Sequence, residues 1–448
     1  MLRLTWTQPE DLVPHGIQAA RLDRVDVEDL AEEWVAAGGS LHAPGSGATQ
    51  EPAPDELRAL ARQLLSRLDE RPAPEGLRRR EPDDLDEILA AARPATPLPA
   101  PTDLADRVHG AWLGRAAGCL LGKPVEKIPR DGIREIAQST GNWPIAHYFT
   151  EVGLNPAVAA RFPWNRRSRL TSLVENIDGM PEDDDLNFPL IALDLLEQHG
   201  NDLTTADVAR SWLANLPGGR VFTAERIAYR NLLDGYEPEV AGTVHNPFRD
   251  WIGAQIRTDV YGWTHPGDPV AAAWLAWQDA RLSHGRNGVY GAMFAAAACA
   301  AAVTGADIDA VIAAGLSVVP AGSRYATAIT VGADLGACDK PTEDVLDIIH
   351  ARYRGMHWVH VLNNAAALAF ALVRGADDYT ATITTAVTSG WDTDSVGATA
   401  GSIAGARAGA AALPSQWTDP LRNRLASTVP GFDGIGFDTL AARTLALV

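Results

Sequence analysis

Two short acidic clusters are the residues of this chain that could do chemistry through bound metal ions. Residues 182–185 read Glu-Asp-Asp-Asp, and residues 391–395 read Trp-Asp-Thr-Asp-Ser. Mg²⁺ and Ca²⁺ prefer carboxylate oxygens as ligands. If the fold brings the two clusters together, they would form a dinuclear site of oxygen ligands, and such a site can activate water for hydrolysis.

Each cluster also has an ordinary structural explanation. Both stand at the start of a segment with helical spacing, and a helix N-terminus stabilises negative charge through its dipole and its free N–H groups. The second cluster, however, lies between alanine- and glycine-rich segments that we expect to be buried, and buried charges need partners. The nearest basic residues along the sequence are Arg374 and Arg407. A bound metal ion would compensate the negative charge of these carboxylates.

The elements that must position these clusters are helices. Alternating runs of Val, Ile and Thr, which are typical of strands, are missing, and alanine, which favours helices, is abundant. We therefore expect an all-α fold, with one compact multi-helix domain. Thr102 and Asp103 are expected to cap a helix that runs to Gly122. Further helices are expected near residues 186–199, 206–215, 222–233, 269–283, 289–304, 307–315, 342–353, 361–374, 378–388 and 395–411.

The helix after the second cluster carries a stripe of glycines. Gly397, Gly401, Gly405 and Gly409 recur every four residues, which places them on one helix face. Each glycine costs roughly 1 kcal/mol inside a helix. Four in register predict that another backbone lies against this face, inside a soluble core.

The first hundred residues differ from the rest. Segments 27–36 and 54–68 have helical spacing, and the Gly/Pro/Ser/Ala-rich stretch 38–54 separates them. Residues 93–101 read Arg-Pro-Ala-Thr-Pro-Leu-Pro-Ala-Pro, which is typical of a semi-rigid linker. We therefore expect an N-terminal helical appendage at 1–98, with no chemistry of its own, and a catalytic domain at 99–448.

Composition excludes several classes of protein. The formal net charge is −19, and no basic stripe accompanies it, so a nucleic-acid partner is not expected. The longest apolar run, 289–303, is too short to span a bilayer comfortably, and we expect a buried helix there and no membrane association. Three scattered cysteines and an N-terminus without the apolar core of a signal peptide lead us to expect a cytoplasmic protein.

The second acidic cluster resembles a motif of the ADP-ribosylglycohydrolase family. Residues 392–395 stand where that family has Asp-Thr-Asp-Thr, and the glycine-striped helix follows as it does there. The family's other run, Thr-Asp-Asp-Thr, has two possible registers here. We prefer Asp184-Asp185 on its Asp-Asp positions, with Asp183 in the threonine place; the alternative puts Glu182 there. In both, a carboxylate replaces a hydroxyl.

Three more stretches extend the resemblance in the family's order. Residues 110–126 resemble its opening GALLGLAVGDALGAPVE, although Cys119 replaces the usual aspartate. Residues 253–257 (GAQIR) resemble its GAMR loop, and residues 266–284 resemble its P-x-x-P…DA…TH segment. Each motif alone is weak, but the ordered set is specific and covers about 104–415.

The resemblance implies a hydrolase that cleaves the glycosidic bond of an ADP-ribosylated protein or of a small ADP-ribosyl or ribosyl compound. It implies a dinuclear divalent cofactor, two Mg²⁺ (or Mn²⁺), held by Asp183, Asp184, Asp185, Asp392, Asp394 and Ser395. Glu126, Asp184 and Asp392 would be catalytic, with Glu126 beside the scissile bond. Gly253, Ala254 and Arg257 would hold the pyrophosphate. Trp391 would be a stacking wall for a base or ribose, or else a packing residue of the core.

Two alternatives keep the metal site but change the function. The chain could hydrolyse a small riboside or nucleotide metabolite, or it could be a catalytically silent ADP-ribose-binding module. The replaced threonine and the cysteine at position 119 leave room for both.

Overall fold

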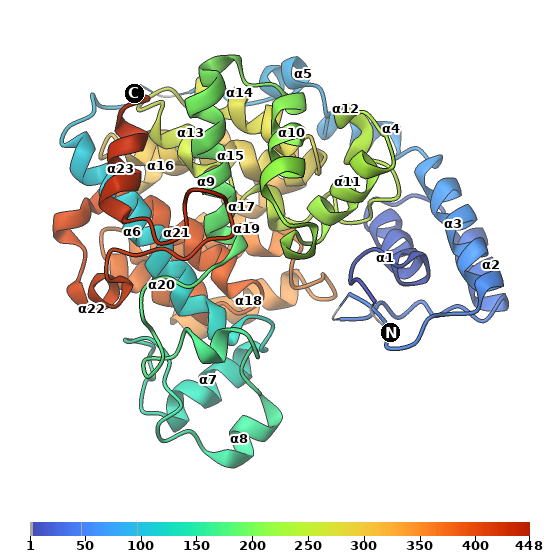
Figure 1. Cartoon of the computed structure of the whole chain (residues 1–448), viewed down its shortest axis with the longest axis horizontal. Coiled ribbons are helices and arrows are strands. Elements are labelled where there is room, and N and C mark those ends of the chain that lie inside the picture. The colour runs from blue at the N-terminus through green and yellow to red at the C-terminus, as the bar shows by residue number, and fades with distance from the viewer. Residues whose placement is uncertain (1–2, 46, 96) are drawn as a thin grey trace.

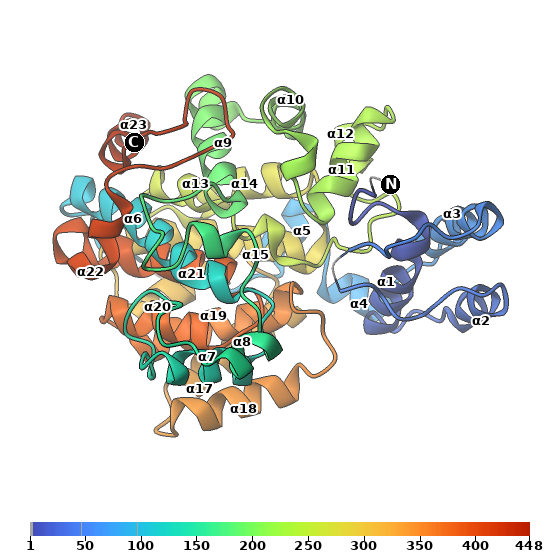
Figure 2. The same cartoon turned by 60° about the horizontal axis from the view of Figure 1, so that its bottom comes forward.

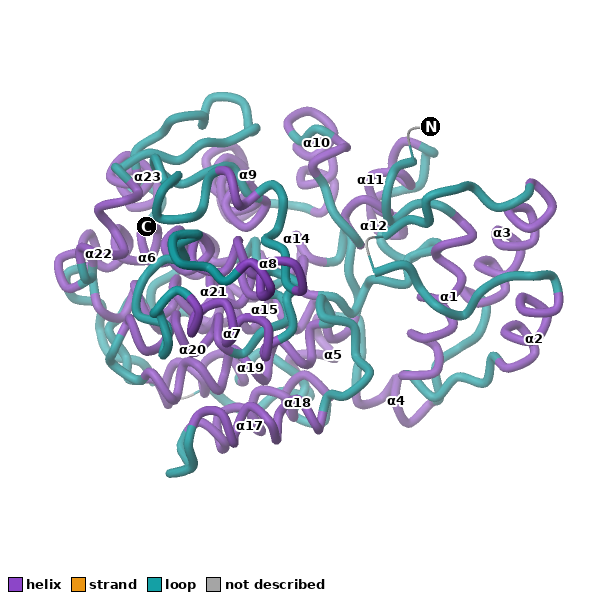
Figure 3. The backbone as a smooth tube through the Cα atoms, turned by 90° about the horizontal axis from the view of Figure 1, so that it is seen from below, coloured by secondary structure: helices purple, strands orange, loops and turns teal. Residues whose placement is uncertain are grey.

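The computed structural model describes residues 3–45, 47–95 and 97–448, and across them the regular elements are helices (Figure 3). The expectation of an all-α fold is confirmed. Among these residues, β-pairing is limited to isolated bridges such as Met180 with Leu425. No helix of the described chain combines the length and the hydropathy needed to cross a bilayer.

The main body contains the helices that follow residue 103 (Figure 1). They are α6 (Leu104–Gly122), α7 (Arg130–Ser139), α8 (Pro156–Arg161), α9 (Asp184–His199), α10 (Thr205–Asn215), α11 (Ala224–Leu233), α12 (Pro238–Ala241), α13 (Asp259–Trp263), α14 (Pro269–Ala280), α15 (Arg286–Ala302), α16 (Ile308–Leu316), α17 (Arg324–Gly336), α18 (Thr342–Arg352), α19 (Val361–Gly375), α20 (Tyr379–Thr388), α21 (Thr393–Ala408), α22 (Ser415–Thr418) and α23 (Phe437–Leu445).

The residues before the Pro-rich stretch form five helices. These are α1 (Pro9–Leu22), α2 (Glu28–Ala36), α3 (Asp55–Asp69), α4 (Glu75–Arg80) and α5 (Leu85–Ala90). Helices α1 to α4 lie together at one end of the molecule in two views related by a rotation (Figures 1 and 2). Residues 97–102 have no regular structure, as the density of prolines leads one to expect.

The glycine stripe of α21 packs directly on a matching stripe of α6. A Cβ atom added at Gly397, Gly401 or Gly405 would overlap a backbone carbonyl of α6. The facing residues on α6 are also glycines, Gly118, Gly114 and Gly110 respectively. The predicted backbone-to-backbone contact is therefore confirmed, and its partner is the first helix of the main body. Gly409 differs from the other three, because it ends α21 with a φ of +83°.

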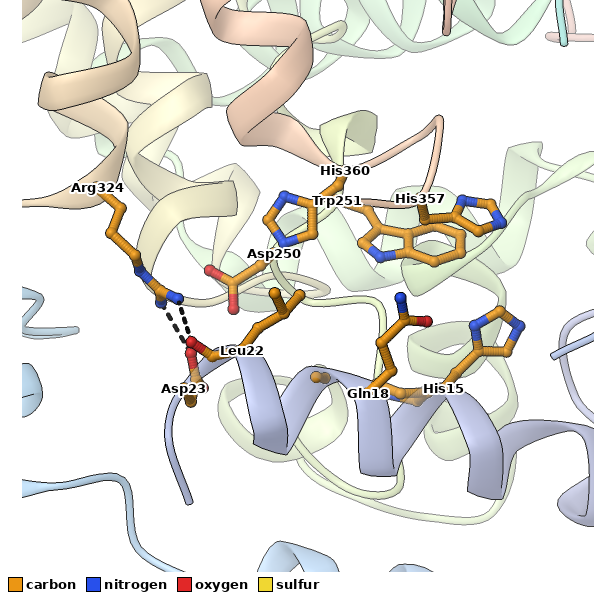
Figure 4. A pocket seen from close by; sticks show the side chains of 11 residues that line it. His15, Gln18, Leu22, Asp23, Asp250, Trp251, Arg324, His357 and His360 are labelled. Atoms are coloured by element: carbon orange, nitrogen blue, oxygen red, sulfur yellow. Dashed lines mark hydrogen bonds and ion pairs between the residues drawn. The ribbon is translucent and has the colours of Figure 1, made fainter. Parts of the chain in front are cut away.

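The N-terminal region is fastened to the main body by a buried aromatic cluster. The Trp6 ring meets Phe248 edge-on at a centroid distance of 5.6 Å and Trp251 at 5.7 Å. His15 of α1 lies 5.0 Å from Phe248, and His357 stacks on Trp251 at 4.3 Å. Figure 4 shows His15 and Gln18 of α1 facing Trp251 and His357 across a small cavity of about 20 Å³. The appendage is thus packed against the main body rather than tethered to it.

Most of the helices expected from the sequence are found within a few residues of their expected bounds. One local expectation was wrong: Asp103 precedes α6 but has a left-handed backbone, and its side chain makes no capping hydrogen bond. Helices α1, α7, α17 and α23 were not expected. In α17, β-branched residues and glycines have low helix propensity, and Gly332 lets this helix pack on the backbone of α19 at Ala366.

The contact between α6 and α21 makes a stability prediction. Gly401→Ala places a methyl group on a carbonyl of α6, so the helices must separate, and we expect the free energy of unfolding to fall by about 1–3 kcal/mol. Gly76→Ala is the matched control, because Gly76 is also helical but has only the end of the Arg80 side chain within 4 Å; it should be neutral or slightly stabilising. Chemical denaturation of both variants measures the difference. Equal midpoints for the two would show that the helices tolerate a wider separation.

Candidate metal centre

The first acidic cluster turns into helix α9. Asp183 is its N-cap residue, and the Asp183 Oδ1 atom accepts a hydrogen bond of 2.9 Å from the backbone N–H of Asp185. Asp184 and Asp185 form the first turn, and Asp185 is 2% exposed. The capping explanation is therefore correct for Asp183. It leaves the carboxylates of Asp184 and Asp185 to be explained.

The second acidic cluster turns into helix α21 in the same way. Asp392 is the N-cap residue but makes no side-chain capping bond, and Asp394 and Ser395 lie in the first turn. All three are less than 10% exposed. The Thr393 hydroxyl donates a hydrogen bond of 2.9 Å to the carbonyl of Gly122, at the end of α6. The start of α21 is thereby fixed against the end of α6.

The two clusters meet. The Ser395 hydroxyl lies 3.5 Å from the Asp185 carboxylate, although the two are 210 positions apart in the sequence. Two groups of potential ligands result, and within each group one ligand atom per residue lies within 4.8 Å of the others. One group is Cys119, Asp183 and Asp185, and the other is Glu126, Asp392 and Asp394.

Glu126 is placed by the end of α6. The helix gives way to a 3₁₀ turn at Lys123–Val125, and Glu126 follows in an extended conformation. Its side chain is 15% exposed. The Asn165 amide donates to one carboxylate oxygen at 2.6 Å, and the Lys127 ammonium lies 3.1 Å from the other. Glu126 therefore has a fixed orientation beside Asp392 and Asp394.

The first acidic cluster has basic partners in α6 and in the turn that follows it, far from the cluster in the sequence. The Lys123 ammonium forms an ion pair with Asp183, and both side chains are at most 10% exposed. The fully buried Arg115 donates to the carbonyl of Asp185 at 2.8 Å and pairs with Asp259 at 2.7 Å. The helical spacing of residues 115, 119 and 123 is the signal that points these side chains to one face.

The carboxylates still outnumber these cations. Burial raises the pKa of Asp184, Asp185 and Asp392 well above the usual range, and the charges of neighbouring aspartates raise it further. Burial and the charge of Glu126 raise the pKa of Asp394 to about 7. Asp183 is the exception: burial raises its pKa, but the Lys123 charge and the hydrogen bonds from Lys123 and Asp185 together outweigh burial and lower the pKa. Additional positive charge would stabilise this cluster.

The family model described as ADP-ribosylglycohydrolase matches residues 100–446. The chain belongs to this family. It is similar to a solved structure described as an ADP-ribosylglycohydrolase-related protein complex, with 23% identity over 77% of this chain and 98% of that chain and a TM-score of 0.45. No curated protein matches the chain.

Glu182 takes no part in either ligand group. One of its carboxylate oxygens accepts from the Asn187 amide at 2.9 Å, and the other pairs with Arg220 at 2.7 Å. This arrangement favours the register in which Asp183 stands in the family's threonine place.

The residues aligned with the family's GAMR loop form a 3₁₀ turn, Ile252–Ala254, beside α11. A Cβ atom at Gly253 would overlap the Glu225 carboxylate, so a side chain there would displace Glu225. Ala254 and Arg257 are fully buried. The Arg257 guanidinium binds Asp279 at 2.5 Å and Glu225 at 3.0 Å. The expectation of a phosphate contact from Arg257 is therefore corrected: its donors are used inside the protein, where they fix the turn.

Trp391 lies at the edge of the site and is also packed. Its ring stacks on His350 of α18 at a centroid distance of 3.9 Å and an angle of 13°. Its backbone is left-handed, with φ of 63°, and its carbonyl accepts from the Lys127 N–H at 3.4 Å. Non-glycine residues rarely hold this conformation, and it concentrates at functional sites.

The donor set fits divalent cations. Its ligands are carboxylate and hydroxyl oxygens, as Mg²⁺ and Mn²⁺ prefer. The Asp185 Oδ1 atom is buried without a hydrogen-bond partner among the described residues, and a cation would satisfy it. Cys119 lies 3.7 Å from Asp185, but burial raises the pKa of its thiol well above the usual range. A thiol that stays protonated is a hydrogen-bond donor to Asp185 rather than a ligand.

The Lys123–Asp183 pair makes a prediction about metal-free protein. Lys123→Met leaves a buried carboxylate unpaired, and we expect the free energy of unfolding to fall by about 3–5 kcal/mol in excess chelator. Lys127→Met is the comparison, because Lys127 is 48% exposed and its pair should contribute no more than about 1 kcal/mol. Denaturation midpoints measure both, and added Mg²⁺ should stabilise Lys123→Met more than the parent. A Lys123 variant as stable as the Lys127 variant would contradict the assignment.

Proposed function

We propose that this chain is a divalent-metal-dependent hydrolase that cleaves the glycosidic bond of an ADP-ribosylated substrate, a protein or a small ADP-ribosyl or ribosyl compound. The observation that carries the proposal is the meeting of the two acidic helix starts beside Glu126. Membership of the ADP-ribosylglycohydrolase family supports the type of bond that is cleaved.

Two Mg²⁺ or Mn²⁺ ions would be held by oxygen ligands from the two acidic helix starts. Asp183, Asp184 and Asp185 come from the start of α9, and Asp392, Asp394 and Ser395 come from the start of α21. When bound, such ions lower the pKa of a water molecule and bind ribose hydroxyls. We assign Asp184 and Asp392 the strongest binding to the ions, because neither side chain has a basic partner within 4.0 Å among the described residues.

We propose that Glu126 acts as the general base. Water attacks C1″ of the ribose, the bond from C1″ to the modified group breaks, and the transition state has oxocarbenium character. A carboxylate beside that carbon can accept the proton of the attacking water and pass it to the leaving group. Asn165 holds one Glu126 oxygen at 2.6 Å, so the carboxylate is oriented before substrate binds. Lys127 lies 3.1 Å from the other oxygen and holds it in place.

The remaining assigned residues would hold the rest of the substrate. The turn at Gly253 and Ala254 would approach the diphosphate through its backbone. Arg257 would act indirectly by fixing that turn. The Trp391 ring would cover a base or ribose from the face opposite His350.

A substrate screen tests this function. Metal-loaded protein should release ADP-ribose from ADP-ribosyl-arginine or ADP-ribosyl-serine conjugates, and should release little or no sugar from free nucleosides. Excess chelator should abolish turnover, and Mg²⁺ or Mn²⁺ should restore it, as followed by product chromatography and by metal analysis of the protein. Turnover of nucleosides alone would identify a riboside hydrolase instead. ADP-ribose binding without any turnover would identify a silent binding module.

Glu126→Gln separates metal binding from chemistry. The amide keeps the size and the Asn165 contact but cannot accept a proton, so turnover should fall by about 10²–10⁴-fold. Metal affinity, measured by calorimetry, should stay close to that of the parent if Asp392 and Asp394 remain as ligands. Glu135→Gln is the control, because Glu135 pairs with Arg161 on the surface. Turnover within about threefold of the parent would move the base to the metal ligands themselves.

A further inference from the structure

The first turn of α11 lies against the substrate-side turn of the proposed site. Glu225, in that first turn, binds Arg257 at 3.0 Å and fills the space in front of Gly253. The charge of Glu225 also acts on Asp184. The N-terminus of this ten-residue helix is therefore close to both the metal ligands and the Gly253 turn.

Arg226, the next residue, is a buried cation whose hydrogen bonds go to neutral acceptors. It is 3% exposed. Its Nη1 atom donates to the carbonyl of Thr5 at 3.0 Å and to the Thr5 hydroxyl at 2.6 Å, and its Nη2 atom donates to the carbonyl of Gly219 at 3.1 Å. Its Nε atom is buried and has no hydrogen-bond partner in the described part of the chain. Burying an uncompensated charge is costly, so the absence of an anionic partner needs an explanation.

The turn that receives Arg226 is tied to the acidic cluster. Gly219 accepts from Arg226, and its neighbour Arg220 pairs with Glu182 at 2.7 Å. Glu182 directly precedes the proposed ligand Asp183. Two independent contacts, one through Glu225 and Gly253 and one through Gly219 and Glu182, thus place Arg226 beside the proposed site.

The charges around Arg226 agree with this position. Burial and the positive charge of Arg167 lower its pKa, the negative charge of Asp184 acts in the opposite direction, and the net pKa is about 10. Arg167 is exposed and two residues from Asn165, which holds Glu126. Arg257 has carboxylate partners on two sides, whereas Arg226 has none within 4.0 Å among the described residues.

We propose that Arg226, in the first turn of α11, binds the diphosphate group of the substrate, an inference that rests on the proposed function. The helix dipole favours an anion at this end of α11. A guanidinium can add two parallel donors. Arg226 thereby takes the role that Arg257 cannot take, because Glu225 and Asp279 already neutralise Arg257.

The N-terminal region then belongs to the substrate site. Thr5 supplies two of the three acceptors that orient Arg226. The adjacent Trp6 ring packs on Trp251, which directly precedes the Gly253 turn. The docking of α1 around Trp251 and His357 (Figure 4) holds this segment in place. Thr5 is a positioning residue, because it acts on the ligand through Arg226.

Binding of ADP-ribose to the full-length, Mg²⁺-loaded protein tests the proposal without requiring turnover. Arg226→Gln should weaken binding about tenfold to a hundredfold by calorimetry, and Arg226→Lys should recover part of the loss. The affinity of Arg226→Gln should also depend less on salt than that of the parent, because a charged contact has been removed. A purely structural role for Arg226 would leave the salt dependence unchanged.

Two further variants keep the test interpretable. Arg230→Gln is the matched control, one helical turn further along α11, where the side chain hydrogen-bonds to Asn231; it should bind ADP-ribose like the parent. Thr5→Val removes one acceptor but keeps the shape and the backbone carbonyl, and should weaken binding severalfold in the same direction. If Arg226→Gln fails to fold, Thr5→Val decides the outcome.

The outcomes also separate this inference from the proposed function. Parent-like affinity and salt dependence in Arg226→Gln, or parent-like affinity in Thr5→Val when Arg226→Gln does not fold, would overturn the inference and leave the hydrolase proposal standing. Arg226-dependent binding in a parent that hydrolyses nothing would support the inference and refute the hydrolase. A parent that binds no ADP-ribose would refute the inference, and turnover of ADP-ribosyl conjugates would then decide the function separately.

Discussion

The glycine contact between α6 and α21 is the constraint on which the rest of the structure depends. Two helices that touch backbone to backbone cannot slide past each other by one residue without overlap, since only glycine fits at each crossing point. The register continues to the end of α6, where Gly122 lies against Thr393. Glu126, just beyond α6, is consequently held beside Asp392 and Asp394. Rigid backbone packing is what a site with several ligands requires.

The packing also offsets an unfavourable electrostatic arrangement. Burial raises the pKa of Asp185 and Asp392 well above the usual range. Keeping these carboxylates ionised therefore costs free energy. Such an arrangement persists only when surrounding structure over-determines it. The apolar core around α15 and α19, whose residues are almost all buried, supplies that surrounding structure. The same electrostatic cost makes the site ready to bind cations.

The sequence predicted what depends on local pattern. Helical periodicity predicted most helices, and the spacing of Gly397, Gly401 and Gly405 predicted a backbone contact, although not its partner on α6. The acidic runs predicted the helix starts. What failed depends on three-dimensional neighbours. Lys123 lies 60 positions from Asp183 along the chain, so counting nearby basic residues missed it. The Arg257 guanidinium could bind a phosphate group. The sequence spacing, however, did not show that the buried carboxylates of Glu225 and Asp279 already bind it.

The position of the N-terminal region follows from polar constraints as much as from apolar ones. Asp23 and Glu81 meet Arg324 at 2.8 and 2.7 Å, and Arg286 of α15 pairs with Asp250 at 2.9 Å and also with Asp23. Removing such charges from water costs much of what their attraction returns, so buried ion pairs add little net stability. They penalise alternative placements strongly, however, because a displaced α1 would leave several buried charges without partners. Apolar contacts such as Trp6 on Trp251 tolerate small shifts, whereas these ion pairs do not. The combination fixes residues 3–23 on the main body closely enough for a single threonine near the N-terminus to orient an arginine beside the proposed site.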